Sequence, residues 1–373
     1  MADGTSIEWT DATWNPIGGC SIKSPGCKPC YAQKLAGTRL KNHPLYAGTT
    51  TPTKDGKPVF NGRLTVAADF HPVWSWPLKW RGAINPKLGP GQPSLIFVGD
   101  MSDLFHEGRP IAQIDRVIIA GLRSPHILQL LTKRPDVMAN YIANLSFARA
   151  VWNCRKSPDE PLPMIGRHSF NDLERLFGLK PRFSYDRDCA AWLGRRLWLG
   201  FSAERQKEFD ERWPAMRPLA DAGWTIFVSH EPALGPITYP RDFLTLGKRA
   251  QVIAGGMSGN DATPALASWF RHDRDQCACA GVPFFFKQWG KWLDADQLLT
   301  RIEAGPSFIV KDGERWQPTR PLNYADAAFL ADTLGHPYEH HSDGSTMLCL
   351  DKRRAGRLLD GVEHNGFPEV KAA

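Results

Sequence analysis

Residues 94–100 read Ser-Leu-Ile-Phe-Val-Gly-Asp, an apolar run without alternation that ends on a glycine and a carboxylate. Strands that are buried on both faces have this pattern, and they occur in parallel sheets covered by helices. Similar apolar runs recur along the chain. The predicted strands are Ile7–Trp14, Leu95–Val98, Ile127–Leu131, Leu197–Phe201, Thr225–Val228, Gln251–Ala254 and Pro283–Phe286.

Stretches with a helical pattern lie between these apolar runs. Repeated alternation of strand and helix predicts an α/β protein, and here it favours a partial or full TIM-like barrel of about six to seven parallel strands. The predicted helices of the barrel are Pro110–Gly121, Pro135–Leu145, Ala203–Ala222 and Thr263–Ala280.

Two insertions and a C-terminal extension accompany the barrel. We expect the barrel over residues 1–295, with insertions at 46–94 and 146–194, and the extension over 296–373. Within the first insertion, Val59–Leu64 contains an Asn-Gly pair, which predicts a β-hairpin turn. Two further helices are predicted outside the barrel, Asn171–Phe177 and the basic Asp351–Leu359.

The charge balance and the N-terminus narrow the class of protein. Among 373 residues, 46 Lys and Arg outnumber 39 Asp and Glu, a formal net charge of +7. A basic balance mildly favours a polyanionic partner such as nucleic acid. The sequence has no apolar stretch of about 18 residues and no signal-peptide pattern at its start. We therefore expect a cytoplasmic protein without a membrane partner, whose thiols stay reduced.

The strongest chemical signal is a Gly/Pro-rich loop that carries Cys20, Cys27 and Cys30 in the spacing C-x6-C-x2-C. Eight cysteines in a chain of 373 residues are too few for a disulfide scaffold, so clustered thiols indicate metal binding. A closed zinc site uses four ligands, as does an ordinary electron-transfer iron–sulfur cluster. A cubane held by three cysteines leaves one iron open. The remaining cysteines, Cys154, Cys189, Cys277, Cys279 and Cys349, form no comparable motif.

Polar residues and glycines follow the predicted strands at their carboxyl ends, where the active sites of α/β barrels lie. Side chains in these positions are also common helix N-caps, so each has a structural interpretation as well. The residues are Gly99, Asp100, Met101, Ser102 and Asp103, then Lys133 and Arg134, Ser202 and Glu204, Glu231, Gly255 and Gly256, and Lys287.

The cysteine loop after the first strand of a partial barrel resembles the radical S-adenosylmethionine (SAM) superfamily. The usual spacing there is C-x3-C-x2-C, so this chain departs from the pattern by a longer first gap. Over about residues 7–365 the chain is similar to a phage-associated family of radical-SAM-like proteins. The matching segments are IEWTDATWNP, GCSIKSPGCKPCYA, VGDMSDLFH, LLTKRP, WLGFSAE, SHEPALGPI, IAGGMSG, DQCACAGVPFFFKQWG and KRRAGRLLDG.

The resemblance implies a radical SAM enzyme in which Cys20, Cys27 and Cys30 hold a [4Fe–4S] cluster. SAM would bind the open iron, and a reductant such as flavodoxin or ferredoxin would supply the electron. The resemblance also implies contacts to SAM from a set of strand-end residues, namely Gly99, Asp100, Met101, Ser102, Lys133, Ser202, Glu204, Gly255 and Gly256.

The substrate implied by this resemblance, together with the basic charge and tail, is a nucleic acid or nucleotide. Chemistry on a base requires an extruded base or a single strand, and Trp76, Trp80 and Trp289 are candidates to stack on it. Their sequence fits core residues equally well. A partner protein encoded nearby is a further expectation that the phage association implies.

Two other functions fit part of the sequence. A binding module would add a fourth ligand, such as His43 or His71, to the three cysteines and hold zinc to stabilise a contact surface. A cluster-independent barrel hydrolase would use Glu204 and Glu231 as paired acid and base. The second function leaves the cysteine loop unexplained.

Overall fold

The computed structural model describes residues 2–143, 194–259, 261–297, 308–309, 315–316, 337–350 and 352–370. The predicted insertion at 146–194, apart from Gly194, lies outside these residues. The predicted helix Asn171–Phe177, Cys154 and Cys189 therefore also lie outside them.

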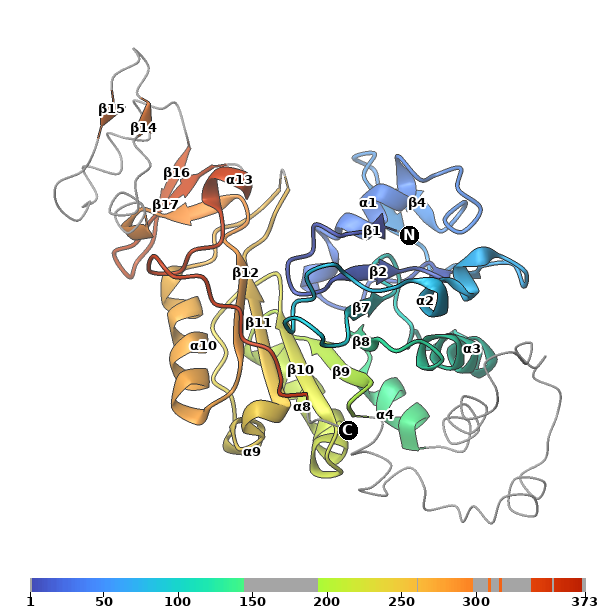
Figure 1. Cartoon of the computed structure of the whole chain (residues 1–373). Coiled ribbons are helices and arrows are strands. Elements are labelled where there is room, and N and C mark those ends of the chain that lie inside the picture. The colour runs from blue at the N-terminus through green and yellow to red at the C-terminus, as the bar shows by residue number, and fades with distance from the viewer. Residues whose placement is uncertain are drawn as a thin grey trace. The chain divides into compact units, whose positions relative to one another are not determined.

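An eight-stranded sheet whose strands follow one another in chain order forms the centre of the fold (Figure 1). The first strand is antiparallel to the second, and the other seven are parallel and curl into a half-barrel. The predicted α/β fold with a partial TIM-like barrel is confirmed. The strands are β1 (Ala2–Asp3), β2 (Ala12–Trp14), β7 (Leu95–Val98), β8 (Ile127–Thr132), β9 (Leu197–Ser202), β10 (Thr225–His230), β11 (Ala250–Gly255) and β12 (Phe284–Gln288).

The apolar runs became strands because both of their faces are covered. All four residues of β7 are buried, and so are all six of β9 and all six of β10. The predicted bounds of these strands lie close to the observed ones, with one exception: the predicted strand Ile7–Trp14 is wrong over its first half. Before Ala12, the Asp11 N–H still donates to the Leu95 carbonyl at 3.1 Å, but the Leu95 N–H donates to the Asp11 carboxylate at 2.7 Å, so a side chain takes the place of the backbone acceptor.

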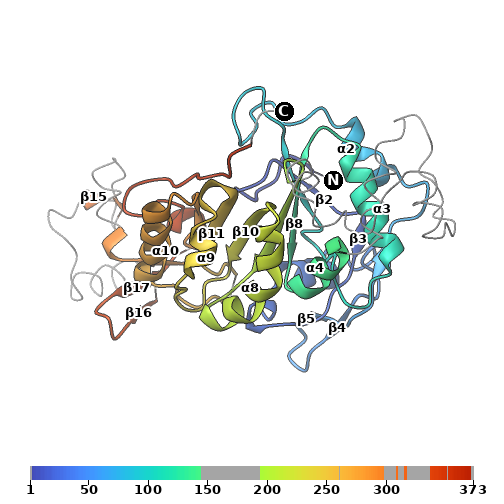
Figure 2. The ribbon, with the colours of Figure 1, turned by 90° about the horizontal axis from the view of Figure 1, so that it is seen from below.

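The chain forms two compact units, of which the first comprises Met1–Ser202, Glu208–Val228 and Pro368–Ala373. Helix α4 lies beside α3 in both views (Figures 1 and 2), and the Tyr141 hydroxyl donates to Asp115 at 2.8 Å. The helices of this unit are α1 (Tyr31–Gly37), α2 (Trp76–Lys79), α3 (Ile111–Leu122), α4 (Pro135–Ala143) and most of α8 (Gln206–Asp221).

Two small two-stranded sheets replace the hairpin predicted at Val59–Leu64. Strand β5 (Pro58–Phe60) pairs with β4 (Thr50–Pro52), and β6 (Thr65–Val66) pairs with β3 (Ile17–Gly18). The hairpin prediction is wrong because each strand next to the Asn-Gly pair finds a partner elsewhere. Asn61 instead donates its amide to the Gly48 carbonyl at 3.1 Å.

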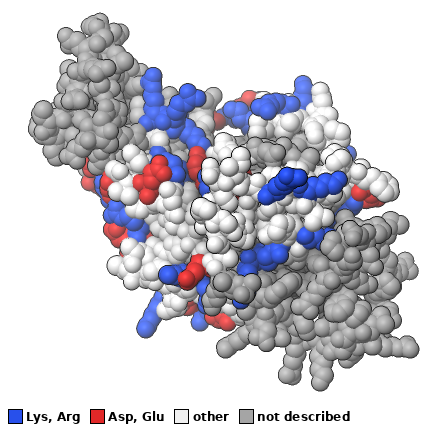
Figure 3. All heavy atoms as spheres, in the orientation of Figure 1, with Lys and Arg blue, Asp and Glu red and all other residues white. Residues whose placement is uncertain are grey.

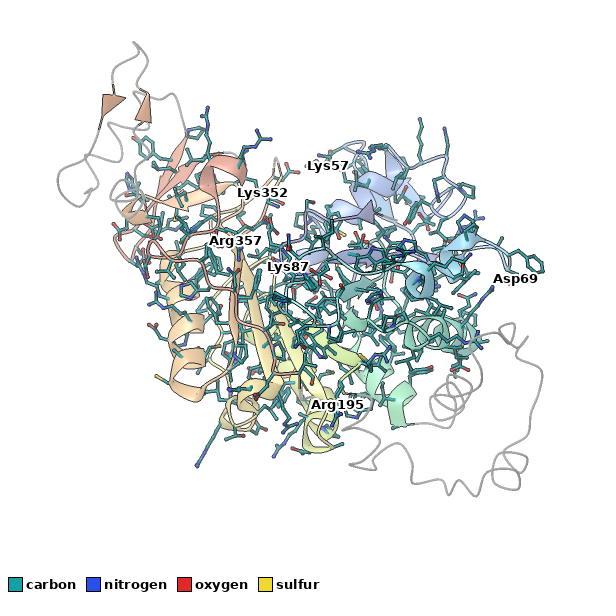
Figure 4. All side chains as sticks on the ribbon, in the orientation of Figure 1. Lys57, Asp69, Lys87, Arg195, Lys352 and Arg357 are labelled. Carbon is teal, nitrogen blue, oxygen red and sulfur yellow. The ribbon has the colours of Figure 1, made fainter. Side chains whose placement is uncertain are left out.

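The outer part of the 46–94 segment is tied to α3. Asp69, labelled in Figure 4, pairs with Arg116 at 2.5 Å between Oδ1 and Nη1. The Arg116 guanidinium also lies 3.9 Å from the centre of the Trp74 ring, in the 3-10 helix η2 (Pro72–Trp74). A cation–π contact and an ion pair therefore hold this segment on the helix.

The second unit comprises Ala203–Lys207 and Ser229–Phe367. In it, α10 (Ala267–Ala280) packs along β11 and β12 (Figure 1), with Phe270, Phe286 and Trp289 in mutual ring contact. The other elements are α9 (Arg241–Leu244), the 3-10 helix η4 (Gly247–Arg249), a three-stranded sheet of β13 (Trp292–Asp294), β17 (Thr346–Cys349) and β16 (Tyr338–His340), a pair of β14 (Phe308–Ile309) and β15 (Arg315–Trp316), and α13 (Lys352–Ala355).

The basic helix predicted over Asp351–Leu359 is shorter in the structure. Helix α13 ends at Ala355, because Gly356 follows with a φ of 65° in the left-handed region. Asp360 beyond it binds two arginines of α10, Arg271 at 2.7 Å and Arg274 at 2.5 Å. Among the helices of the described ranges, none has both the length and the apolar composition that a bilayer crossing requires.

Candidate metal centre

The cysteine loop connects β3 with α1 in the first unit. Its middle is a 3-10 turn, η1 (Pro25–Cys27), in which the Cys27 N–H donates to the Ser24 carbonyl at 2.9 Å. Cys30 is the residue just before α1, and its N–H donates to the Cys27 carbonyl at 3.3 Å. Two successive turns therefore bring Cys27 and Cys30 into one compact segment.

Glycine at position 19 lets the chain reach Cys20. Gly19 has a φ of 81°, and a Cβ there would lie 1.9 Å from the Arg63 carbonyl oxygen. The Arg109 guanidinium donates to the Gly18 carbonyl at 3.1 Å from below. Any residue other than glycine would push the start of the loop away from its support.

Gln33, in the first turn of α1, clamps the loop from the other end. Its buried amide donates to the carbonyls of Cys27 at 3.0 Å and Lys28 at 2.9 Å, and its oxygen accepts the Phe60 N–H at 3.4 Å. Sequence reasoning missed Gln33, because its partners come from two separate segments, the cysteine loop and β5. The signal that could have found Gln33 is a polar residue at a buried position of a short helix that directly follows the cysteine motif.

An ion-pair network centred on Arg134 lies next to Cys20. Asp103 accepts the Arg134 Nη1 at 3.0 Å and the Thr132 hydroxyl at 2.7 Å. Arg134 Nη2 donates to the Ser21 hydroxyl at 2.8 Å, and Arg134 Nη1 lies 3.9 Å from Cys20 Sγ. Asp103 lies in the loop after β7 and Arg134 lies just after β8, so the segments that follow two parallel strands meet at this sulfur.

His106 and Glu107 extend the network outward. The Gly108 N–H donates to His106 Nδ1 at 3.1 Å, so that nitrogen carries no proton, and Nε2–H donates to the Ser21 hydroxyl at 2.8 Å. Burial and the nearby Arg134 lower the pKa of His106, which agrees with a neutral ring. Glu107 accepts Arg134 Nε and pairs with Lys23 at 2.9 Å, at a side chain that is 47% exposed.

Gly99, Asp100, Met101 and Ser102 form a tight turn after β7. Gly99 has a φ of 76°, and the Ser102 N–H donates to its carbonyl at 2.9 Å. Met101 packs in the cluster of apolar side chains that also contacts Cys20 and Cys30. The turn therefore lies against the cysteine loop.

Asp100 is held by two side chains that sequence reasoning missed. Asn15 donates to Asp100 Oδ1 at 2.5 Å, and the Tyr31 hydroxyl donates to Oδ2 at 3.2 Å. Burial raises the pKa of Asp100, and these two hydrogen bonds oppose the rise. The Ser102 hydroxyl, in contrast, is buried and has no hydrogen-bond partner within the described residues. An orphaned buried hydroxyl of this kind is compatible with a missing ligand.

Lys133 and Ser202, two other predicted contacts, belong to the same unit. The Lys133 N–H donates to Asp103 at 3.4 Å, and its positive charge acts on Cys30. Ser202 is buried at the end of β9, where its carbonyl accepts Arg212 Nη1 at 2.6 Å. Lys133 thus lies near the cysteine loop, whereas the observed bond of Ser202 ties β9 to α8.

Burial raises the pKa of two of the three thiols, Cys20 and Cys30, which favours their protonated form. Burial, reinforced by Asp103 and opposed by Arg134, raises the pKa of Cys20 to about 12. Burial also raises the pKa of Cys30. Cys27 contributes to both shifts, so it lies within electrostatic reach of both other thiols.

The chemistry of the donor set fits an iron–sulfur cluster. Three thiols lie on one short loop, beside the buried cations Arg109 and Arg134. Across the described part of the chain, no three His, Cys, Asp or Glu side chains converge closely enough to hold a metal ion. Neutral thiols have no electrostatic reason to gather, and metal binding removes their protons. Three-point ligation therefore requires the thiols to draw together on binding.

The other predicted contacts belong to the second unit. Glu204 is fully buried after β9, and the Leu234 N–H donates to its carbonyl at 2.7 Å. A Cβ at Gly256 would lie 2.0 Å from the Trp289 carbonyl oxygen, so packing of the chain itself demands glycine there. A Cβ at Gly255 would lie 2.7 Å from the Glu231 carboxylate, which pairs with Lys287 at 3.0 Å. Glu231 is thus part of an ion pair, in contrast with the acid–base pair of the hydrolase hypothesis.

The aromatic and histidine candidates are engaged in other contacts. Trp76 stacks on Trp80 with ring centres 5.2 Å apart, and Trp289 is 1% exposed, so the base-stacking prediction for Trp289 is wrong. His43 accepts the Leu45 N–H at 3.2 Å, and His71 accepts the Val73 N–H at 3.1 Å. Each imidazole therefore already caps a local turn.

Comparisons with known proteins identify the family of this chain. No curated protein and no solved structure matches it. A family model matches residues 4–368, which is far more than half of the 373 residues. The chain therefore belongs to the family described as "Protein of unknown function (DUF5131)".

Proposed function

We propose that this chain is a radical SAM enzyme in which Cys20, Cys27 and Cys30 hold a [4Fe–4S] cluster. The observation that carries the proposal is the three-thiol loop that follows β2 and β3, supported by the buried Arg134–Asp103 pair at 3.0 Å. A closed structural metal site needs a fourth protein ligand, and His43 and His71 each use one ring nitrogen in a local turn.

The turn Gly99–Ser102 is the best-supported contact for SAM. The Asp100 carboxylate, oriented by Asn15 and Tyr31, is suited to bind an ammonium group. The orphaned Ser102 hydroxyl offers a further hydrogen bond. Lys133 suits a carboxylate as a flexible cation. Ser202, Glu204, Gly255 and Gly256 remain proposed contacts that rest on the resemblance.

A cluster held by Cys20, Cys27 and Cys30 would supply one-electron reduction of SAM, the chemistry that leads to hydrogen abstraction from a substrate. The side chains of the chain orient SAM and exclude water around it. We further propose a nucleic acid or nucleotide as substrate. The net charge of +7 and the several groups of Lys and Arg side chains on the visible face (Figure 3) support this class. A flavodoxin or ferredoxin as reductant and a partner protein encoded nearby complete the proposal.

Anaerobic reconstitution with iron and sulfide, followed by SAM and a strong reductant, tests the activity. We expect release of 5′-deoxyadenosine, and loss of that release in Cys20→Ala, Cys27→Ala and Cys30→Ala. Cys279→Ala is the matched control, since Cys279 is an exposed cysteine of α10 outside the loop. A cluster that forms but never cleaves SAM would refute the reaction. Zinc bound without iron would favour the alternative, a metal-stabilised nucleic-acid or protein binding module.

A further inference from the structure

Arg134 is the buried cation nearest to the proposed cluster ligands. Its side chain is 2% exposed, and its guanidinium contacts two carboxylates, those of Asp103 and Glu107. Burial of a guanidinium is costly unless each donor is paired, so this one is fixed in a single orientation.

The guanidinium grips the residue next to Cys20 as well as facing its sulfur. Nη2 donates to the Ser21 hydroxyl at 2.8 Å and to the Ser21 carbonyl at 3.4 Å. Nη1 lies 3.9 Å from Cys20 Sγ. The Ser21 contacts fix the backbone that carries the thiol, and the Nη1 contact brings positive charge to it.

Charges of both signs lie near the Cys20 sulfur. Asp103 lies on the other side of Nη1 and acts on Cys20 with the opposite sign to Arg134. Glu107 is shared with Lys23, so part of its charge is directed to solvent. Asp103 acts on Cys20 more strongly than Arg134 does, so Arg134 offsets part of the negative charge at this sulfur.

Resting on the proposed function, we propose that Arg134 is a positioning residue that holds the Cys20 ligand in place and makes the cluster easier to reduce. A cluster with three thiolate ligands becomes more negative when it accepts one electron from the flavodoxin- or ferredoxin-type reductant. A fixed positive charge stabilises the more negative state and raises the reduction potential.

The test is an electron paramagnetic resonance titration of the reconstituted protein against potential. We compare Arg134→Gln, which removes the charge, with Arg134→Lys, which keeps it. Arg134→Gln should lower the ratio of reduced to oxidised cluster about tenfold at a fixed potential, a shift of ~59 mV for a one-electron couple. Arg134→Lys should stay close to wild type. The control is Arg116→Gln on α3, because Arg116 pairs with Asp69 and is not among the charges acting on Cys20.

Asp103→Asn gives an independent arm of opposite sign, since it removes the opposing negative charge and should make reduction easier. It decides the question if Arg134→Gln does not take up a cluster. Equal potentials in wild type, Arg134→Gln and Asp103→Asn would overturn the inference and leave the proposed function standing. A wild-type protein that binds no iron would overturn both.

Discussion

Two buried polar networks in this chain end in different ways. In the first unit, Arg134 and Asp103 lead to the Cys20 thiol, 3.9 Å from the guanidinium. In the second unit, His230 donates to Asp273 at 2.7 Å and to the Gly235 carbonyl at 2.9 Å, and the Tyr239 hydroxyl donates to Asp273 at 3.0 Å. The hydrogen bonds named for the second network join its members to one another and to a carbonyl, whereas those of the first lead to the Cys20 thiol.

The two histidines show the same contrast. His106 has a backbone N–H on Nδ1 and a cation nearby, and these keep its ring neutral. His230 has an acceptor on each ring nitrogen, so it binds two protons. Burial alone would lower the pKa of His230, but Asp273 outweighs it and raises the pKa. A buried pair of this kind stabilises a fold, and a network that leaves a thiol at its edge is suited to hold a ligand.

The largest effect is expected from breaking the second network. Asp273→Asn leaves a buried imidazolium without its counter-charge and should cost about 3–5 kcal/mol of unfolding free energy. Urea unfolding followed by circular dichroism measures it. Iron uptake by the folded fraction should not change. A loss of iron uptake together with unchanged stability would contradict this distinction between the two networks.

A smaller effect is expected from releasing the cysteine loop. Gln33→Met removes the donors to the carbonyls of Cys27 and Lys28 and should cost about 1–3 kcal/mol. We also expect faster loss of iron during gel filtration, because the loop is freer. Gln276→Met is the matched control, since Gln276 likewise donates to two carbonyls and accepts a backbone N–H in the second unit. Equal loss of iron from both variants would show that Gln33 has no specific role.

The smallest effect is a pH dependence of stability from His230. Its folded pKa lies above the unfolded value of about 6.5. The stabilisation by the charged ring is therefore complete below about pH 6.5 and disappears as the pH rises through the folded pKa. Unfolding free energies measured between about pH 5 and pH 9 should fall over that window, and the fall should be absent in His230→Gln. A flat wild-type profile would show that His230 binds a single proton.

The strands were predictable because burial on both faces leaves a local trace. Leu95–Val98 is apolar throughout, and β7 has those bounds. The Asn-Gly hairpin at Val59–Leu64 failed for the opposite reason, since β5 and β6 pair with β4 and β3, which lie elsewhere in the sequence. An Asn-Gly pair predicts a turn, but which strands pair depends on segments elsewhere in the sequence.

Sequence reasoning singled out the three thiols of the candidate site, but it missed residues that hold their loop in place. Cys20, Cys27 and Cys30 share one loop, so their spacing alone singled them out. Gln33 was missed because its bonds reach Cys27, Lys28 and Phe60 at once. Trp289 was left open between base stacking and the core, because a tryptophan in a core and one at a surface look alike in sequence, and the structure places it in the core. Contacts between segments distant in sequence decide the partners of Gln33 and the burial of Trp289.

The iron and sulfide content of the anaerobically reconstituted chain tests the central claim most directly. The account predicts about four irons per wild-type chain, with a cubane signal that changes when SAM is added, and loss of that signal in Cys27→Ala. Iron that stays bound in Cys27→Ala, or zinc in place of iron in the wild type, would contradict it.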